Sequence, residues 1–264
     1  MDRFETRFER LELKFVVSEA QALRIRRDLE PYCSEDEHNR PGAATGVSGY
    51  PVRSLYLDSP TLEFYRAKMR GDPDRIKLRV RRYEGPGPFS LELKRKVSQV
   101  IQKTRVMVHR EGLEETARGR GKLWDETPEE RRFTEHFGYL MAATGADPAL
   151  LVRYDREAYS SVVDDYARVT MDRNVASQRS DTWDLEGDPD RWCEVRHFLT
   201  PGAPKPLVVL ELKCRPRVPF WMTDLIRRHQ LRPQTFSKYC IGIQTTGLLM
   251  GSESLRQRCG RILR

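Results

Sequence analysis

Basic residues occupy every second position of one short segment, Arg75-Ile76-Lys77-Leu78-Arg79-Val80-Arg81. Successive side chains of a β-strand point to opposite faces, so this segment predicts all four cations on one face and the aliphatic groups on the other. A row of fixed cations along a strand can cradle a series of phosphate groups. From this segment alone, the solvated polar face of a half-buried strand is an equally good interpretation.

Charged and apolar residues alternate in the same way in several other segments. The charged positions are Arg10, Glu12 and Lys14; Glu92, Lys94 and Lys96; Lys103 and Arg105; Arg156; Arg168 and Asp172; and Glu211 and Lys213. If these strands close into one barrel, every charged face can point inward while the apolar faces pack against outer helices. We therefore expect an α+β fold, an antiparallel β-barrel with helices packed outside it.

Such an interior needs an anionic partner, because a buried charge without a partner is too costly to keep. The interleaved carboxylates are too few to neutralise the cations; they are Glu12, Glu92, Asp172 and Glu211. The sequence therefore predicts a bound polyanion. Carboxylate oxygens are also the ligands that Mg²⁺ or Mn²⁺ prefers beside phosphate.

The composition is consistent with this expectation. The formal net charge is +8 over 264 residues, which favours an anionic partner without separating nucleic acid, anionic lipid, nucleotide and polyphosphate. The length fits one large β-rich domain, and no long Pro/Gly/Ser-rich linker divides the chain. We expect a single domain over residues 1–264.

Cysteine usage and the start of the chain indicate the cytoplasm. The five cysteines are scattered without a CxxC pair, so neither a disulfide framework nor a zinc site is predicted. No apolar stretch approaches the roughly 20 residues of a membrane span, and the first residues lack a signal-peptide core.

Local signals place the expected strands and helices. Strands are expected near 8–17, 52–57, 75–83, 89–97, 99–109, 150–160, 166–175, 192–199 and 206–214. Helix starts are indicated at Ser18, at Asp58-Ser59-Pro60 and at Thr127-Pro128-Glu129-Glu130, and the last helix is expected near 219–229. In the helix near 61–70, the residues expected at the barrel wall are Leu62, Tyr65 and Met69. Residues 109–126 are expected to form a charged connection.

Nine short motifs together resemble the VTC domain. They are Arg10-Leu11-Glu12-Leu13-Lys14, Tyr56-Leu57-Asp58-Ser59, Lys77-Leu78-Arg79-Val80-Arg81, Glu92-Leu93-Lys94, Lys103, Tyr154-Asp155-Arg156, Arg168-Val169-Thr170-Met171-Asp172, Glu211-Leu212-Lys213 and Ser237-Lys238-Tyr239. This domain is the catalytic part of vacuolar transporter chaperone complexes and belongs to the triphosphate tunnel metalloenzyme superfamily. The resemblance implies a tunnel of about eight antiparallel strands, and transfer of the γ-phosphate of ATP to a growing polyphosphate chain.

The resemblance and the alternation together suggest residue roles. The candidate catalytic residues are Lys14, Arg79, Arg81, Lys94, Arg156 and Lys238. Further phosphate-binding candidates are Arg10, Lys77, Lys103, Tyr154, Arg168, Lys213 and Ser237. Glu211 is the candidate ligand of Mn²⁺ or Mg²⁺. Phosphoryl transfer depends mainly on positioning and charge neutralisation, so such a set needs no nucleophilic side chain.

One position departs from the wider superfamily. Its triphosphatases usually begin with Glu-x-Glu-x-Lys, whereas Arg10 stands here at the first position of that motif. Replacing a carboxylate by a cation should weaken a second metal that could activate water. We therefore expect transfer to phosphate to be favoured over hydrolysis.

Several alternatives remain open at the level of the sequence. The chain could be a metal-dependent triphosphatase or a non-catalytic polyphosphate-binding module. Glu211 and Lys213 could form ordinary salt bridges, and Lys103 and Arg105 could protect an edge strand. Nucleic acid is not expected, because aromatic residues do not interleave with the basic positions. The expected partners are ATP and polyphosphate, and a membrane-protein partner at the cytoplasmic face is compatible with the resemblance.

Overall fold

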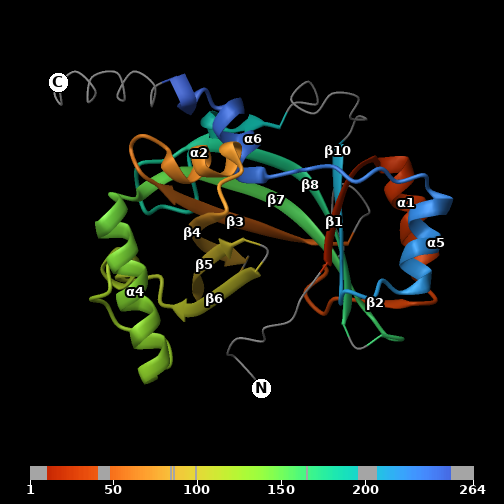
Figure 1. Cartoon of the computed structure of the whole chain (residues 1–264), viewed down its shortest axis with the longest axis horizontal. Helices are drawn as coiled ribbons and strands as arrows, with labels where there is room; N and C mark the ends of the chain where they lie inside the picture. The colour runs from red at the N-terminus through yellow and green to blue at the C-terminus, as the bar shows by residue number, and fades with distance from the viewer. Residues whose placement is uncertain are drawn as a thin grey trace.

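One curved antiparallel sheet forms the centre of the protein (Figure 1). The computed structural model describes residues 11–40, 48–83, 85, 87–98, 100–164, 166–195 and 207–250. Eight strands follow one another in the order β1-β10-β8-β7-β3-β4-β5-β6, while β2 pairs with β7 and β9 with β8. The strands are β1 Leu11–Ser18, β2 Cys33–Glu35, β3 Tyr50–Asp58, β4 Asp74–Tyr83, β5 Phe89–Val97, β6 Val100–Val108, β7 Asp147–Ser161, β8 Ala167–Arg179, β9 Cys193–Glu194 and β10 Leu207–Cys214.

The helices lie around the sheet. They are α1 Glu19–Leu29, α2 Glu63–Arg70, α3 Leu113–Ala117, α4 Pro128–Thr144, α5 Phe220–Arg228 and α6 Lys238–Thr245. A 3-10 turn covers Pro189–Arg191. In the described part of the chain, no helix combines the length and the apolar character that crossing a membrane requires.

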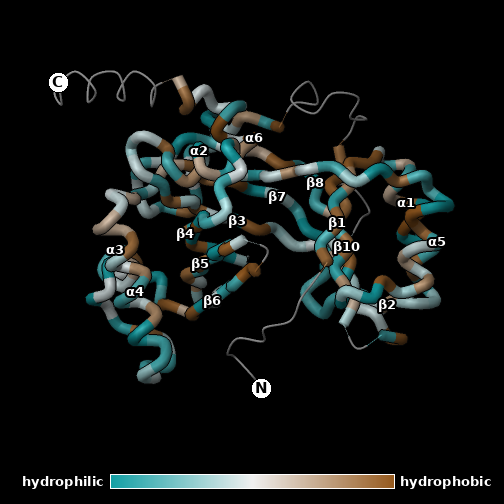
Figure 2. The backbone as a smooth tube through the Cα atoms, viewed as in Figure 1, coloured by the Kyte–Doolittle hydropathy of each residue, from teal (hydrophilic) through white to brown (hydrophobic). Residues whose placement is uncertain are grey.

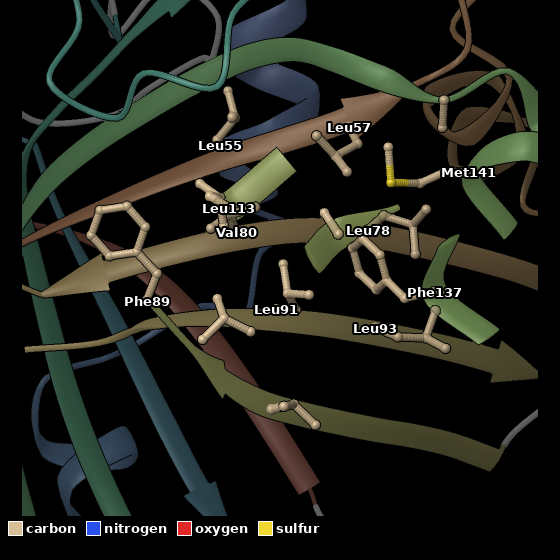
Figure 3. Close-up of a cluster of buried hydrophobic side chains, with 14 of the residues drawn as sticks. Leu55, Leu57, Leu78, Val80, Phe89, Leu91, Leu93, Leu113, Phe137 and Met141 are labelled. Carbon is tan, nitrogen blue, oxygen red and sulfur yellow. The ribbon is translucent and has the colours of Figure 1, made fainter. Parts of the chain in front are cut away.

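On β3, β4 and β5, and on β1, β8 and β10, a row of apolar residues points outward, toward the helices, and we call this side of the sheet the outer face. Hydrophilic and hydrophobic residues alternate along the central strands (Figure 2). On β3, β4 and β5 the outward residues pack against α3 and α4 (Figure 3), and this cluster includes Leu55, Leu57, Leu78, Val80, Leu91, Leu93, Leu113, Phe137 and Met141. The alternation predicted from the sequence therefore sets which face is buried against helices.

A second outer cluster lies under α1 and α5. It joins β1, β8 and β10 to the two helices through Phe15, Val17, Ile25, Val169, Met171, Leu210, Leu212, Trp221 and Leu225. Burying aliphatic and aromatic side chains contributes about 1.5–3 kcal/mol for each large group. The two clusters lie at opposite ends of the strand order. Packing of helices on the outer face therefore stabilises the curved shape of the sheet.

The opposite, inner face carries the charged residues, and α6 covers one part of it. Side chains of α6 pack onto apolar inner positions of β3, β7 and β10, in a cluster that includes Val52, Leu150, Val152, Val209, Tyr239, Ile241 and Ile243. Aliphatic groups therefore fill part of the inner face, and the charged region lies beside them.

The α+β class and the antiparallel sheet are confirmed. The path of eight strands also agrees with the expected number, although no backbone ladder joins β6 to β1 among the described residues. Two of the three helix start signals are confirmed, whereas α2 begins at Glu63, with Leu62 as its N-cap residue, rather than directly after Pro60. Ser18 Oγ accepts a hydrogen bond from the Gln21 N–H group, and Thr127 forms a capping box with Glu130 at the start of α4.

Some expectations were wrong in detail. Helix α6 follows α5, so 219–229 is not the last helix. Met69 is 55% exposed rather than at the wall, whereas Leu62 and Tyr65 are buried. The connection 109–126 contains α3, and of the strand expected near 192–199 only Cys193–Glu194 pairs among the described residues.

Asp58 ties three elements together at the end of β3. Its buried carboxylate accepts hydrogen bonds from the N–H groups of Ser59 at 2.7 Å, Phe64 at 2.9 Å and Tyr65 at 3.0 Å. The hydroxyl group of Tyr239, on α6, also donates to it. The carboxylate thus substitutes for an N-cap of α2 and fixes the position of α6.

We predict that Asp58→Asn lowers the free energy of unfolding by about 2–3 kcal/mol, because an amide nitrogen cannot accept the bonds from Tyr65 and Tyr239. Urea denaturation measures the change. Asp72→Asn is the control, since Asp72 forms an exposed pair with Arg70 and its loss should change stability little. Equal urea midpoints for Asp58→Asn and the unmodified protein would contradict the assignment.

Candidate functional site

The carboxylate of Glu92, on β5, forms ion pairs with three of the cations on the inner face. The Nε atom of Arg79 lies 2.8 Å from its carboxylate, Lys103 Nζ lies 3.3 Å away and Arg81 Nη1 lies 3.7 Å away. Burial alone would raise the pKa of Glu92, but these cations outweigh burial and hold the pKa well below its usual value. The carboxylate is therefore ionised and fixes the cations of β4.

Asp172 on β8 forms a second centre. Its two carboxylate oxygens accept from Arg156 Nε at 2.7 Å and Arg156 Nη2 at 2.8 Å, and Lys238 of α6 bonds the same group. The ring of Tyr154 lies against both cations, 4.5 Å from Lys238 Nζ and 5.2 Å from Arg156 Cζ. Burial opposes ionisation of Asp172, but Arg156 and Lys238 outweigh it and keep the pKa well below its usual value.

Glu211 on β10 forms the third centre. Lys213 Nζ lies 2.7 Å from its carboxylate and Lys14 Nζ lies 4.0 Å away. Lys14 also pairs with Glu12 at 3.0 Å, so the same amine lies next to the carboxylates of both Glu12 and Glu211. Glu211 thus pairs closely with Lys213 of its own strand and, at a longer distance, with Lys14 of the neighbouring strand β1.

Two carboxylates side by side fit a divalent cation that shares its other ligands with phosphate. Among the described residues, no group of three or more acidic, histidine or cysteine side chains could hold a metal ion without further ligands. Mg²⁺ is commonly bound by one or two carboxylates together with water and substrate phosphates, and Glu12 and Glu211 offer that donor set. Among the described residues, Glu92 and Asp172 are each paired with an arginine, whereas Glu12 and Glu211 pair with lysines alone.

Inner side chains from both ends of the sheet approach each other. Lys94 on β5 lies 3.9 Å from Glu12 on β1, although these strands are seventh and first in the strand order. Lys77 on β4 donates to Ser237, the N-cap of α6, at 3.4 Å. The sheet therefore curls far enough for its inner face to form one shared site.

Cations outnumber carboxylates in this site. Nine of the predicted lysines and arginines lie there, namely Lys14, Lys77, Arg79, Arg81, Lys94, Lys103, Arg156, Lys213 and Lys238, against the four carboxylates Glu12, Glu92, Asp172 and Glu211. Lys77 has no carboxylate partner within the described ranges. Burial lowers the pKa of Lys77, Lys94 and Lys103, with repulsion from neighbouring cations adding to it, and brings that of Lys103 to about 8.

One predicted site residue, Arg168, stands apart from this group. The side chain of Arg168 is 44% exposed and pairs with Asp36 at 2.9 Å, so it lies at the rim. Arg10 lies outside the described residues.

Tyr56 is a member of the site to which the sequence analysis gave no role. Its hydroxyl group accepts a hydrogen bond from Arg79 Nη1 at 3.3 Å, and its ring stacks on Tyr239 with 4.9 Å between centroids. Burial opposes ionisation, but Arg79, Lys77 and Arg81 outweigh it and lower the pKa of Tyr56 to about 8. A tyrosine alternating with Ser54 beside the cationic strand was the available sequence signal.

A cavity of about 280 Å³ lies on the outer face instead, lined in part by Arg82, Phe89, Leu113 and Trp183. Glu186, at its wall, already pairs with Arg53 and Arg82. The cavity does not adjoin the clustered cations, so we place the candidate site on the inner face.

Comparison with known proteins identifies a family. The model of the VTC domain matches residues 9–246. Among solved structures, HpAC1 from Hippeastrum, described with a dominant triphosphatase activity, has 14% identity and a TM-score of 0.47, covering 90% of this chain and 97% of that chain. The PH1819 protein of Pyrococcus horikoshii has 12% identity and a TM-score of 0.42, covering 89% and 98%. A search of curated proteins found no match.

We predict that Tyr56 ionises near pH 8, well below the usual tyrosine value of about 10. Absorbance at 295 nm, which reports tyrosinate, should therefore rise in an early step as the pH rises through 8. Tyr56→Phe should remove that step, whereas Tyr65→Phe, outside the cation cluster, should keep it. Titration of every tyrosine above pH 9.5 would show that the cations do not surround Tyr56 as described.

Proposed function

Because the chain belongs to the VTC domain family, we propose that it is a polyphosphate polymerase that transfers the γ-phosphate of ATP to a polyphosphate chain. The excess of fixed cations on one enclosed face is the observation that carries this proposal. A chain of phosphates supplies closely spaced negative charges, which is the ligand that such a face lacks.

Two groups of inner cations would each bind a different phosphate group. Arg79 and Arg81 are held by Glu92 on one side, and Arg156 and Lys238 are held by Asp172 on the other. Because side chains already oriented by carboxylates need little reorganisation, they can neutralise charge that develops during transfer. Lys14 and Lys94, which both pair with Glu12, and Lys77, which donates to Ser237, complete the cationic surface.

In the proposed reaction, a terminal oxygen of polyphosphate attacks the γ-phosphorus of ATP. A new P–O bond forms, the bond between the γ-phosphorus and the bridging oxygen breaks, and ADP leaves with that electron pair. The products are ADP and a chain that is one phosphate longer. No protein nucleophile takes part, and the cations align the two phosphates in line.

Glu12 and Glu211 would hold Mn²⁺ or Mg²⁺ against the phosphate oxygens of the nucleotide. When bound, the metal would withdraw charge from the transferred group. Without the metal, Lys14 and Lys213 neutralise these carboxylates. When the metal binds, the amines of both lysines could bind phosphate oxygens instead. Cytoplasmic location and a membrane-protein partner stay predictions.

Incubation with ATP and Mn²⁺, with and without a short polyphosphate primer, tests the proposal when products are resolved by chain length. We expect chains longer than the primer, together with ADP. Orthophosphate as the main product would indicate a triphosphatase instead. Binding of polyphosphate without any turnover would indicate a binding module.

We predict that Glu211→Gln reduces chain elongation at least a hundredfold while tripolyphosphate still binds in the absence of metal, because the metal ligand is lost while the inner cations remain. Elongation kinetics and calorimetry measure the two effects. Glu35→Gln is the control, since Glu35 pairs with Arg26 at a distance from the inner site and its loss should leave elongation unchanged. Full elongation by Glu211→Gln would refute the metal assignment.

A further inference from the structure

The hydroxyl group of Thr170, buried on the inner face, has no hydrogen-bond partner among the described residues. Within the described part of the chain, two buried side-chain polar atoms lack a partner, Thr170 Oγ1 and Ser177 Oγ. Thr170 is only 6% exposed. It lies on β8 between Arg168 and Asp172, whose side chains share its face of the strand.

An unmet hydrogen bond at a buried site is unfavourable. Valine has nearly the same shape as threonine and suits a β-strand equally well, so packing alone gives no reason for a hydroxyl group here. The alternative explanation is that the missing partner arrives with a ligand.

The neighbours of Thr170 indicate what that ligand is. Its cross-strand partners are Glu211 on β10 and Ala158 on β7, and Ala158 presents only a methyl group. The Glu211 carboxylate is engaged by Lys213, and the carboxylate of Asp172, two residues along the strand, is engaged by Arg156. In the described part of the chain neither carboxylate accepts from the Thr170 hydroxyl group. The surrounding cations favour an anionic acceptor that arrives with a ligand.

We propose that Thr170 is a substrate-binding residue, whose hydroxyl group donates a hydrogen bond to a non-bridging oxygen of the bound phosphate chain beside Glu211. This inference deepens the proposed function and rests on it, because it takes the ligand to be a phosphate chain. Thr170 would add a neutral, directional contact to a site composed mainly of charges.

Ser177 provides a matched comparison on the same strand. Its Oγ atom is equally buried and equally without a partner, but it packs beneath α6. A Cβ added at Gly242 of α6 would lie 3.2 Å from Ser177 Oγ and 2.6 Å from Leu150 Cδ2, so this region is tightly filled. No phosphate chain can reach it without displacing α6.

Calorimetric titration with tripolyphosphate in EDTA, together with thermal unfolding of the phosphate-free protein, tests the proposal. We expect Thr170→Val to bind about tenfold more weakly, because it loses a hydrogen bond to a charged group. Its unfolding temperature should be equal to or higher than that of the unmodified protein, since the hydroxyl has no partner in the free state. Thr170→Ser should restore binding, and Ser177→Ala should bind normally.

Each contrary result has a distinct meaning. Unchanged affinity of Thr170→Val, while the unmodified protein binds, would overturn the role of Thr170 alone. A lowered unfolding temperature would overturn it as well, by revealing a structural partner of the hydroxyl group. A loss of affinity seen only with Mn²⁺ present would assign the hydroxyl to metal-bound water instead. If the unmodified protein does not bind tripolyphosphate, the proposed function itself fails.

Discussion

Repulsion among like charges on the inner face is the constraint on which the rest of the structure depends. Lysines and arginines from β1, β4, β5, β6, β7, β10 and α6 meet there, and four carboxylates hold them apart in fixed positions. Glu92 and Asp172 are buried and ionised because each contacts two or more cations. Lys77 has no carboxylate partner among the described residues, and burial, together with repulsion from Lys94 and Lys14, lowers the pKa of its amine.

The outer apolar clusters offset the unfavourable repulsion among the inner cations. Leucine, valine and phenylalanine side chains pack the outer face against α1, α3, α4 and α5, and this burial stabilises the sheet independently of the charges inside. Helix α6 then closes part of the inner face and brings Ser237 and Lys238 toward the cations. Asp58 and Tyr239 secure that helix. Stability and anion binding are thus supplied by opposite faces of the same strands.

Much of this could be predicted from the sequence, because a period of two fixes the face on which each side chain lies. The alternation in β4, β5 and β10 placed Arg79, Glu92 and Glu211 on the inner face correctly. Arg168 obeys the same alternation yet pairs with Asp36 at the rim, because position along the strand, not its period, decides depth. Tyr56 and Thr170 gained their roles only from neighbours on other strands. No local pattern indicates such neighbours.

A crystal structure of the protein with tripolyphosphate tests the central claim most directly. The account predicts phosphate groups on the inner face, with oxygens within hydrogen-bond distance of Arg79, Arg81 and Arg156, and no large change in the strand order. Tripolyphosphate bound only on the outer face, for example in the cavity beside Arg82 and Trp183, would contradict it.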